Sequence, residues 1–359
     1  MKKKHVIIPI FIPHEGCPHD CVFCNQKRIT GNYQETTGKI VEETIQIYLN
    51  AIKNRDAVHV EVAFYGGSFT GINIDKQKEL LYSASIWKEK GVIQDIRIST
   101  RPDYIYPWTT AYLTQYGVTI VELGVQSLSE DVLAASNRGH SVEDVARAMK
   151  YLKQSHLQIG IQLMVGLPQD DAAKLNSTTD KVIALSPDFV RIYPALVIKD
   201  TYLEYLYESG TYQPLSIAEA VQLCKTMLLK FARHHIPVIR IGLQPTDEMI
   251  IGKNIVAGPF HPSFRQLVEA SMYYDMISFL LMQYQSIVEN VLMIETNDRT
   301  LSYVVGQKKE NIIRLKNVYQ LKKIEIYRNN QLTDGDIMII LNSNDKVCYN
   351  INQYVKTIF

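Results

Sequence analysis

Apolar residues recur along this chain in short runs that alternate with longer amphipathic stretches. The short runs are rich in Val and Ile, and several are apolar at every position, which is typical of parallel strands covered on both faces. They predict strands at residues 5–13, 58–66, 96–101, 118–126, 157–166, 189–195 and 236–243. The longer stretches predict helices at residues 41–54, 75–90, 141–154, 172–184 and 216–234. Ser141 and Ser216 each precede an acidic residue by three positions, which is the spacing of a helix capping box.

This alternation predicts repeated β–α units. Right-handed crossovers join such units into a parallel sheet with helices outside it, so we expect an α/β fold. Six or seven units could close into a full or partial barrel. A flat, doubly wound sheet is the alternative, and periodicity alone does not separate the two.

The pattern changes near residue 287. Residues 291–295 and 323–327 predict strands, and residues 311–319 predict a short helix. Seven Lys and Arg but only two Glu lie between Gly306 and Arg328, whereas the rest of the chain carries a net charge of −4. We therefore expect residues 1–286 to form the barrel together with an extension, and residues 287–359 to form a small basic α/β unit.

Composition and charge exclude some classes of protein. The chain of 359 residues is 46% apolar and 21% charged, which is ordinary for a globular protein. Its 38 basic and 37 acidic residues exclude a protein-wide basic field for nucleic acid, although not a local patch. The apolar run at residues 6–13 is too short to span a bilayer, and no signal cleavage site follows it. We expect a cytoplasmic protein without membrane association.

The strongest chemical signal is a group of three cysteines, Cys17, Cys21 and Cys24. Soft thiolates select iron–sulfur clusters, zinc or cuprous copper over hard cations. Three cysteines leave one iron of a cubane cluster open for a small molecule. The alternative is a structural zinc site with His14 or His19 as fourth ligand, although such sites normally pair ligands on two separated arms.

The spacing of these cysteines, with aromatic Phe23 before the last, resembles the radical S-adenosylmethionine (SAM) superfamily. The resemblance implies a partial parallel (β/α) barrel in which Cys17, Cys21 and Cys24 hold one [4Fe–4S] cluster. It also implies that the open iron chelates SAM, which is cleaved reductively to a 5′-deoxyadenosyl radical. A reductant such as flavodoxin or ferredoxin would supply the electron.

Further candidate residues stand at the carboxyl ends of the predicted strands, where barrels gather functional groups. Paired glycines let a ligand approach the backbone closely, although alone they indicate only a turn. The resemblance places the methionine amine of SAM at Gly66 and Gly67, with Ser68 beside them, and its ribose or carboxylate at Gln126 and Arg138. The remaining candidates for SAM contact are Ser127, which could instead be a buried cap, and Gln162, Met164 and Tyr193. Candidates for substrate contact are Tyr65, Tyr193 and His261, the last of which could instead lie in a rigid loop.

Several segments narrow the resemblance further. Residues 121–127, 160–168, 191–199 and 236–245 resemble the radical SAM part of the Elongator catalytic subunit and its bacterial relatives. That subunit spaces its first two cysteines more widely, and we expect no acetyltransferase domain in this chain. The resemblance implies modification of RNA, with tRNA as the first candidate. The alternatives are the same radical chemistry on a small metabolite such as a porphyrinogen, and a non-catalytic scaffold that binds zinc or RNA.

The basic unit at residues 287–359 has the order strand, glycine loop, helix and strand, and resembles a KH module. The GxxG loop of such a module clamps a nucleic-acid backbone. Here the loop reads Gly306-Gln-Lys-Lys309 and lacks the second glycine. We expect phosphate contacts from Lys308, Lys309, Arg314 and Lys316, although a solvated basic helix face would have the same pattern.

Overall fold

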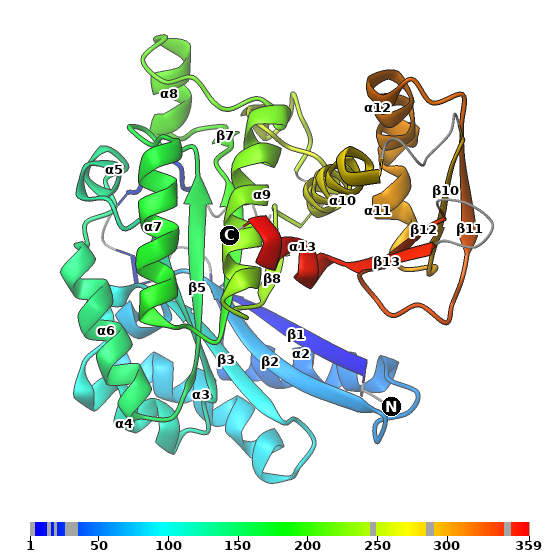
Figure 1. Cartoon of the computed structure of the whole chain (residues 1–359). Helices are drawn as coiled ribbons and strands as arrows, with labels where there is room; N and C mark the ends of the chain where they lie inside the picture. Colours follow the sequence, from blue (N-terminus) through cyan, green and yellow to red (C-terminus); the bar gives the residue numbers. More distant parts are fainter. Residues whose placement is uncertain are drawn as a thin grey trace. The chain divides into compact units, whose positions relative to one another are not determined.

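A computed structural model describes residues 4–12, 16–17, 20–25, 35–244, 249–284, 291–340 and 346–358 of the chain. The chain forms two compact units. Figure 1 labels their helices and strands. The first unit comprises Met1–Leu215 and Leu243–Phe260, and the second comprises Ser216–Gly242 and His261–Phe359.

The first unit is built on a parallel sheet. In the part of the chain that the structure describes, its strands are β1 (Lys4–Ile12), β2 (Val58–Gly66), β3 (Asp95–Thr100), β4 (Ile120–Gln126), β5 (Gln158–Val165) and β6 (Phe189–Pro194). They lie side by side in chain order, and each neighbouring pair is parallel. A doubly wound sheet would reverse its order at a switch point, so this order confirms the predicted partial (β/α) barrel.

Burial explains why these segments are strands. All seven residues of β4 are buried, as expected for a parallel strand that is covered on both faces. The pairing of β4 with β5 is regular except between Gly124 and Gln126, where the register shifts. Gln126 has a positive φ of 68° at this bulge, so the bulge changes the direction of the last side chain of β4.

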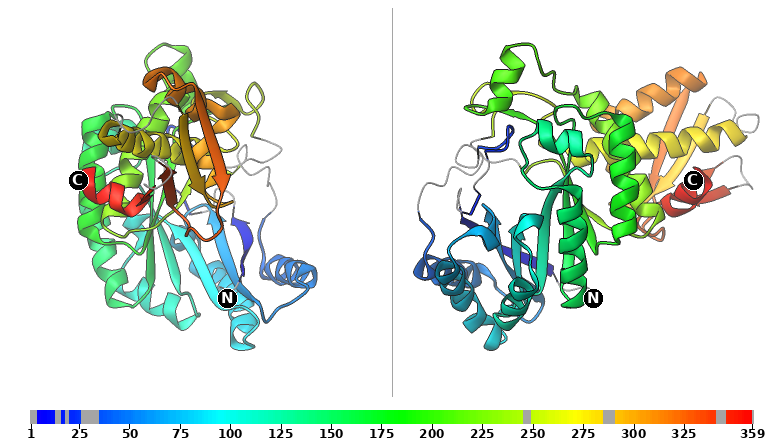
Figure 2. Two further views of the ribbon diagram at one scale, coloured as in Figure 1. Left: turned by 45° about the vertical axis from the view of Figure 1, so that its right-hand side comes forward. Right: turned by 90° about the vertical axis from the view of Figure 1, so that its left-hand side faces the viewer.

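Helices cross from one strand to the next and cover the sheet (Figure 2). The four helices predicted for this unit are confirmed as α2 (Gly38–Ala51), α3 (Ile74–Glu89), α6 (Val142–Gln154) and α7 (Ala172–Leu185). The predicted capping box of Ser141 and Asp144 opens α6. Sequence analysis did not predict α4 (Pro107–Gln115), because its Thr and aromatic residues show no one-sided apolar pattern. Three short helices, α5 (Glu130–Ala135), η1 (Phe69–Gly71) and η2 (Pro102–Tyr104), were also not predicted.

A small subdomain completes the first unit. It contains the antiparallel pair β7 (Val197–Ile198) and β9 (Ile255–Ala257), and helix α8 (Tyr202–Glu208). The segment that carries Cys17, Cys21 and Cys24 is called the cysteine segment. Its residue Val22 packs in a hydrophobic cluster with Val197, Leu203 and Tyr212. This packing ties the cysteine segment to the polypeptide that follows β6.

The second unit begins earlier in the chain than residue 287. Helices α9 (Ile217–Arg233) and α10 (Phe264–Tyr284) and strand β8 (Val238–Ile241) belong to it, although sequence analysis assigned residues 1–286 to the barrel with its extension. The reason is packing, because α10 supplies much of the second unit's hydrophobic core. Helix α10 itself was not predicted, since buried residues surround it on several faces and leave no amphipathic pattern.

The remainder of the second unit contains a four-stranded sheet in the order β11–β10–β12–β13. The predicted strands and helix are confirmed as β10 (Val291–Thr296), β11 (Lys323–Arg328) and α12 (Glu310–Tyr319). Strands β12 (Asp336–Ile340) and β13 (Lys346–Asn350) and helices α11 (Leu301–Val305), η3 (Gln307–Lys309) and α13 (Ile351–Ile358) were not predicted. Among the residues described, no helix combines the length and apolar character needed to cross a bilayer.

Candidate active site

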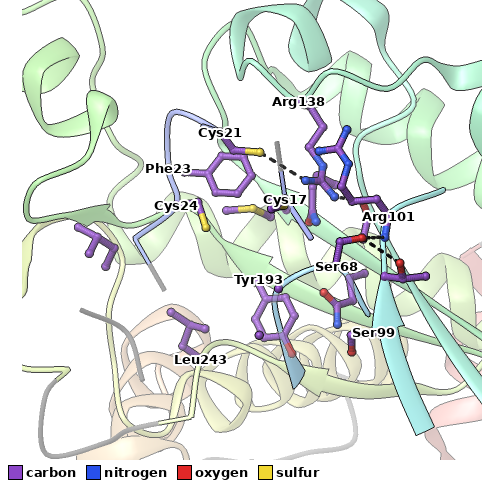
Figure 3. Close-up of a pocket in the computed structure, with 18 of the residues that line it drawn as sticks. Cys17, Cys21, Phe23, Cys24, Ser68, Ser99, Arg101, Arg138, Tyr193 and Leu243 are labelled. Atoms are coloured by element: carbon purple, nitrogen blue, oxygen red, sulfur yellow. Dashed lines mark hydrogen bonds between the residues drawn. The ribbon is translucent and has the colours of Figure 1, made fainter. Parts of the chain in front are cut away.

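A cavity of about 320 Å³ opens at the carboxyl ends of the parallel strands of the first unit. Its wall takes residues from the end of every strand from β1 to β6 and from the cysteine segment (Figure 3). All three predicted metal ligands, Cys17, Cys21 and Cys24, line it. The cavity is therefore a site to which the barrel strands and the cysteine segment both contribute side chains.

Backbone hydrogen bonds hold the cysteine segment in place. The N–H of Val22 donates to the carbonyl oxygen of Ser136 over 3.1 Å, and the N–H of Leu203 donates to the carbonyl oxygen of Val22 over 2.7 Å. The N–H of Cys24 donates to the carbonyl oxygen of Cys21 over 3.0 Å, which closes a turn between these two cysteines. The positions of the thiols thus depend on contacts with residues more than 100 positions away.

A glycine pair forms another part of the cavity wall. The N–H of Gly67 donates to the carbonyl oxygen of Ile12 over 2.7 Å, and Gly66 has a φ of 105°. The hydroxyl of Ser68 lies 2.9 Å from that of Thr100 and accepts a hydrogen bond from the N–H of Arg101 over 3.1 Å. The ends of β1, β2 and β3 are therefore joined directly at the cavity.

Two buried arginines give the cavity positive charge. Arg138 Nη1 lies 3.3 Å from Cys21 Sγ, and Arg138 Nη2 donates to the carbonyl oxygen of Gly124 over 2.6 Å. Arg101 is only 2% exposed, and its guanidinium donates to the carboxylate of Asp103. Burial raises the pKa of the Cys17 thiol above its ordinary value, and the charges of Arg138 and Arg101 act in the opposite direction.

Below this layer, the barrel interior holds a buried network of charges. Arg97 of β3 forms ion pairs with both Glu61 and Glu122, and Arg191 of β6 contacts Glu122 at 3.0 Å. The side-chain amide of Gln162 donates to Glu122 over 2.9 Å. Because Gln162 also lines the cavity, it connects the cavity wall to the network. Two carboxylates and two guanidiniums balance in charge, which is the condition for keeping such groups buried.

The donor set fits an iron–sulfur cluster, because three soft thiolates line one cavity. Among the residues described, no three His, Cys, Asp or Glu side chains are grouped closely enough to bind one metal ion. In a cubane cluster each cysteine binds a different iron, so the three thiolates lie farther apart than around one zinc ion. His14 and His19, the proposed fourth zinc ligands, lie outside the described residues. The buried donors Arg138 Nε and Arg101 Nη1 have no hydrogen-bond partner within the described part of the chain, which suits an anionic group in this cavity.

Comparison with known protein families agrees with this geometry. The profile of the Radical SAM superfamily matches residues 11–182, and the profile of the Radical_SAM C-terminal domain matches residues 187–274. This chain belongs to the radical SAM superfamily. It is therefore a radical SAM enzyme, and membership of the family implies the use of a [4Fe–4S] cluster and of SAM.

Two curated relatives match a large part of this chain. The uncharacterised protein MJ0486 of Methanocaldococcus jannaschii is 29% identical over 257 residues, which cover 69% of this chain and 77% of that protein. The tRNA uridine(34) acetyltransferase of the same organism is 29% identical over 269 residues, covering 63% of this chain. This match spans only 50% of the acetyltransferase.

A solved structure shows the same fold. It is an Elp3 with an N-terminal deletion from Methanocaldococcus infernus, and it superimposes with a TM-score of 0.60. The two chains are 22% identical, and the superposition covers 77% of this chain and 64% of that Elp3. The family profiles and the sequence matches, together with this fold, confirm the predicted relationship to the radical SAM part of the Elongator catalytic subunit.

Nearly all the residues that sequence analysis proposed for SAM contact line this cavity. Lining it are Gly66, Gly67, Ser68, Gln126, Arg138, Gln162, Met164 and Tyr193. Ser127 does not line it, because its hydroxyl instead accepts a hydrogen bond from the N–H of Ser129 and faces Thr178. Tyr65 is not among the lining residues either, and its hydroxyl lies 3.3 Å from Arg191 Nη2. His261 belongs to the second unit, where its ring lies 3.1 Å from the amide of Gln307.

Sequence analysis missed one important residue of this radical SAM site, Arg101. It follows β3 directly, and its neighbours Ser99 and Thr100 also line the cavity. The signal was available, because Arg101 ends a predicted strand in the same way as the other candidates do. It was overlooked because no motif marks the end of that strand.

Proposed function

We propose that this protein holds one [4Fe–4S] cluster through Cys17, Cys21 and Cys24, binds SAM beside it, and uses reductive cleavage of SAM to modify an RNA, with tRNA as the first candidate. The observation that supports the proposal best is a shared cavity, which the three cysteines and the glycine pair line together. The cluster, when bound, supplies the electron that cleaves SAM.

The residues of the chain have separable roles in this proposal. Gly66 and Gly67 present backbone to the methionine end of SAM without side chains in the way. Arg101 and Gln126 offer hydrogen-bond donors to the carboxylate or ribose, and Met164 and Tyr193 offer apolar surface to the adenosine. The barrel strands that line the cavity would shield a reactive radical from bulk water on that side.

Two observations favour RNA as the substrate. Relatives that match this chain are named for tRNA uridine(34) acetylation, although the match covers only half of the first of them. In addition, Lys308 and Lys309 are exposed in the loop before α12. Arg314 is also exposed, but its guanidinium stacks on the ring of Tyr274 at 4.0 Å, so we assign it a smaller share of phosphate binding.

The radical chemistry is tested with anaerobically reconstituted protein. We expect iron, sulfide and dithionite-dependent formation of 5′-deoxyadenosine from SAM in the natural protein, and loss of all three in Cys21→Ala. Cys348→Ala is the matched control, because Cys348 is an exposed cysteine of the second unit. Since radical SAM enzymes can require substrate for SAM cleavage, the assay is run with and without bulk tRNA. Zinc in place of iron and sulfide would overturn the proposal.

The choice of RNA is tested by tRNA binding at several salt concentrations. Charge reversal in the double variant Lys308→Glu with Lys309→Glu should weaken binding about tenfold or more and reduce its salt dependence. The control reverses Lys39 and Lys53, two exposed lysines of the first unit. If the natural protein binds no tRNA, the RNA substrate is wrong. If only the control variant loses affinity, the RNA surface lies outside the basic loop.

A further inference from the structure

Arg138 approaches the cysteine thiols from the interior of the protein. Arg138 is only 6% exposed, and its Nη1 lies 3.3 Å from Cys21 Sγ. Its Nη2 donates to the carbonyl oxygen of Gly124 over 2.6 Å, which fixes the direction of the guanidinium. Figure 3 shows the guanidinium directed toward the sulfur of Cys21.

Arg138 has no carboxylate partner among the residues that the structure describes. Within the described part of the chain, no ion pair involves Arg138, and its Nε has no hydrogen-bond partner. Its neighbour His140 adds no further positive charge, because burial and the nearby arginines lower the pKa of His140 to about 3. A full positive charge therefore lies beside a thiol that is itself only 6% exposed.

Arg101 lines the same cavity, but its guanidinium pairs with a carboxylate. It is 2% exposed, and its Nε and Nη2 donate to the two oxygens of Asp103 over 2.9 and 3.0 Å. The carboxylate offsets much of the guanidinium charge. The remaining charge lies at the same cavity as Cys17, since both residues line it.

These contacts have a direct redox consequence. Reduction adds one electron to a cluster whose thiolate ligands already make it negative. Positive charge nearby and hydrogen bonds to a ligating sulfur stabilise the reduced state more than the oxidised state, and the effect is large where water is excluded. A guanidinium that donates to a ligating sulfur therefore makes the cluster easier to reduce.

We propose that Arg138, and to a smaller extent Arg101, raises the reduction potential of the cluster that Cys17, Cys21 and Cys24 hold. The inference rests on the proposed function, because it requires that cluster. It changes the role of Arg138, which sequence analysis assigned to SAM. In this proposal Arg138 acts on the cluster through Cys21 and is a positioning residue.

The alternative role for the two arginines is to bind the carboxylate of SAM, and it predicts a different result. If the two guanidiniums served only to bind the carboxylate of SAM, removing them would weaken SAM binding and leave the potential of the SAM-free cluster unchanged. The decisive measurement is therefore made without SAM. It is a redox titration of the reconstituted full chain, followed by electron paramagnetic resonance of the reduced cluster.

The titration compares the natural protein with Arg138→Met, Arg138→Lys, Arg101→Met and the control Arg147→Met. Arg147 lies on α6 and pairs with Asp144 instead of a cysteine. We expect a more negative midpoint potential in Arg138→Met, a smaller shift in the same direction in Arg101→Met, and none in Arg147→Met. Arg138→Lys retains the charge but not the planar donor pair, so its potential should fall between those of the natural protein and Arg138→Met.

The outcomes separate the inference from the proposed function. If the natural protein forms no iron–sulfur cluster, both are overturned. If the cluster forms and Arg138→Met and Arg138→Lys have the natural potential, only the inference is overturned, and a weakened SAM affinity in the same variants would assign Arg138 to SAM. Should Arg138→Met fail to retain a cluster, the shift in Arg138→Lys decides the question.

Discussion

The backbone N–H of Gly67 donates to the carbonyl oxygen of Ile12 over 2.7 Å and thereby joins the ends of β1 and β2. The preceding residue, Gly66, has a φ of 105°, and a Cβ atom there would lie 2.5 Å from the same carbonyl oxygen. At position 66, only glycine tolerates both the positive φ and the close approach of the Ile12 carbonyl oxygen. The glycine pair thus has a structural cause in addition to its proposed contact with SAM.

Gly66→Ala should destabilise the protein by about 3 kcal/mol or more, because positive-φ strain and a clash with backbone add together. Gly91→Ala is the matched control, since Gly91 also has a positive φ of 70° but an added Cβ would meet no atom within 4 Å. The control should lose only about 1 kcal/mol. Urea denaturation measures both, and equal losses would show that the contact with Ile12 has no energetic effect.

Glu122→Gln should destabilise the protein by about 3–5 kcal/mol, because it removes a buried carboxylate that contacts both Arg97 and Arg191. Glu43→Gln, at the exposed pair of Lys39 and Glu43, should change stability by about 0.5 kcal/mol or less. Thermal or urea unfolding gives the comparison.

A second variant tests the cause of that loss. Adding Arg191→Met to Glu122→Gln removes one uncompensated buried charge and should recover part of the lost stability. If the loss of stability in the double variant equals the sum of the losses in Glu122→Gln and Arg191→Met, the two side chains are not coupled.

Asp170 should make stability depend on pH. Burial raises the pKa of its carboxyl to about 6, although the N–H groups of Gly166 and Asp171 act to lower it. A raised pKa in the folded protein favours the neutral form, so the stabilisation is present below about pH 4 and is lost as the pH rises through 6. The free energy of unfolding of Asp170→Asn should therefore rise relative to the natural protein by about 2–3 kcal/mol between pH 4 and pH 7. A difference that stays constant over this range would contradict the prediction.

Tyr212→Phe should destabilise the protein by about 1–2 kcal/mol. The hydroxyl of Tyr212 donates to the carbonyl oxygen of Gly166 over 2.6 Å, and the variant leaves that acceptor without this partner. Tyr202→Phe, at a tyrosine that is 58% exposed, should remain within about 0.5 kcal/mol of the natural protein. Calorimetric unfolding measures both variants, and equal effects would show that the hydrogen bond to Gly166 contributes nothing.

Local pattern predicted the scaffold of the first unit well. The strands from β1 to β6 and helices α2, α3, α6 and α7 follow from runs and periodicities that lie within single segments. The pattern did not reveal α4 or α10, because tertiary packing stabilises them and they show little amphipathic contrast. It also did not place α9 and α10 in the second unit, since that depends on which core they help to form.

In the candidate site too, the sequence predicted some features and only the tertiary structure revealed others. The spacing of Cys17, Cys21 and Cys24 was by itself sufficient to identify the radical SAM family, because ligand type and spacing are properties of one short segment. The direction of a side chain is not such a property. A bulge turns Gln126 into the cavity while Ser127, the next residue, hydrogen-bonds elsewhere. Only the tertiary structure brings Arg138 to Cys21, 117 positions away, because that contact depends on the cysteine segment packing against residues that follow β4.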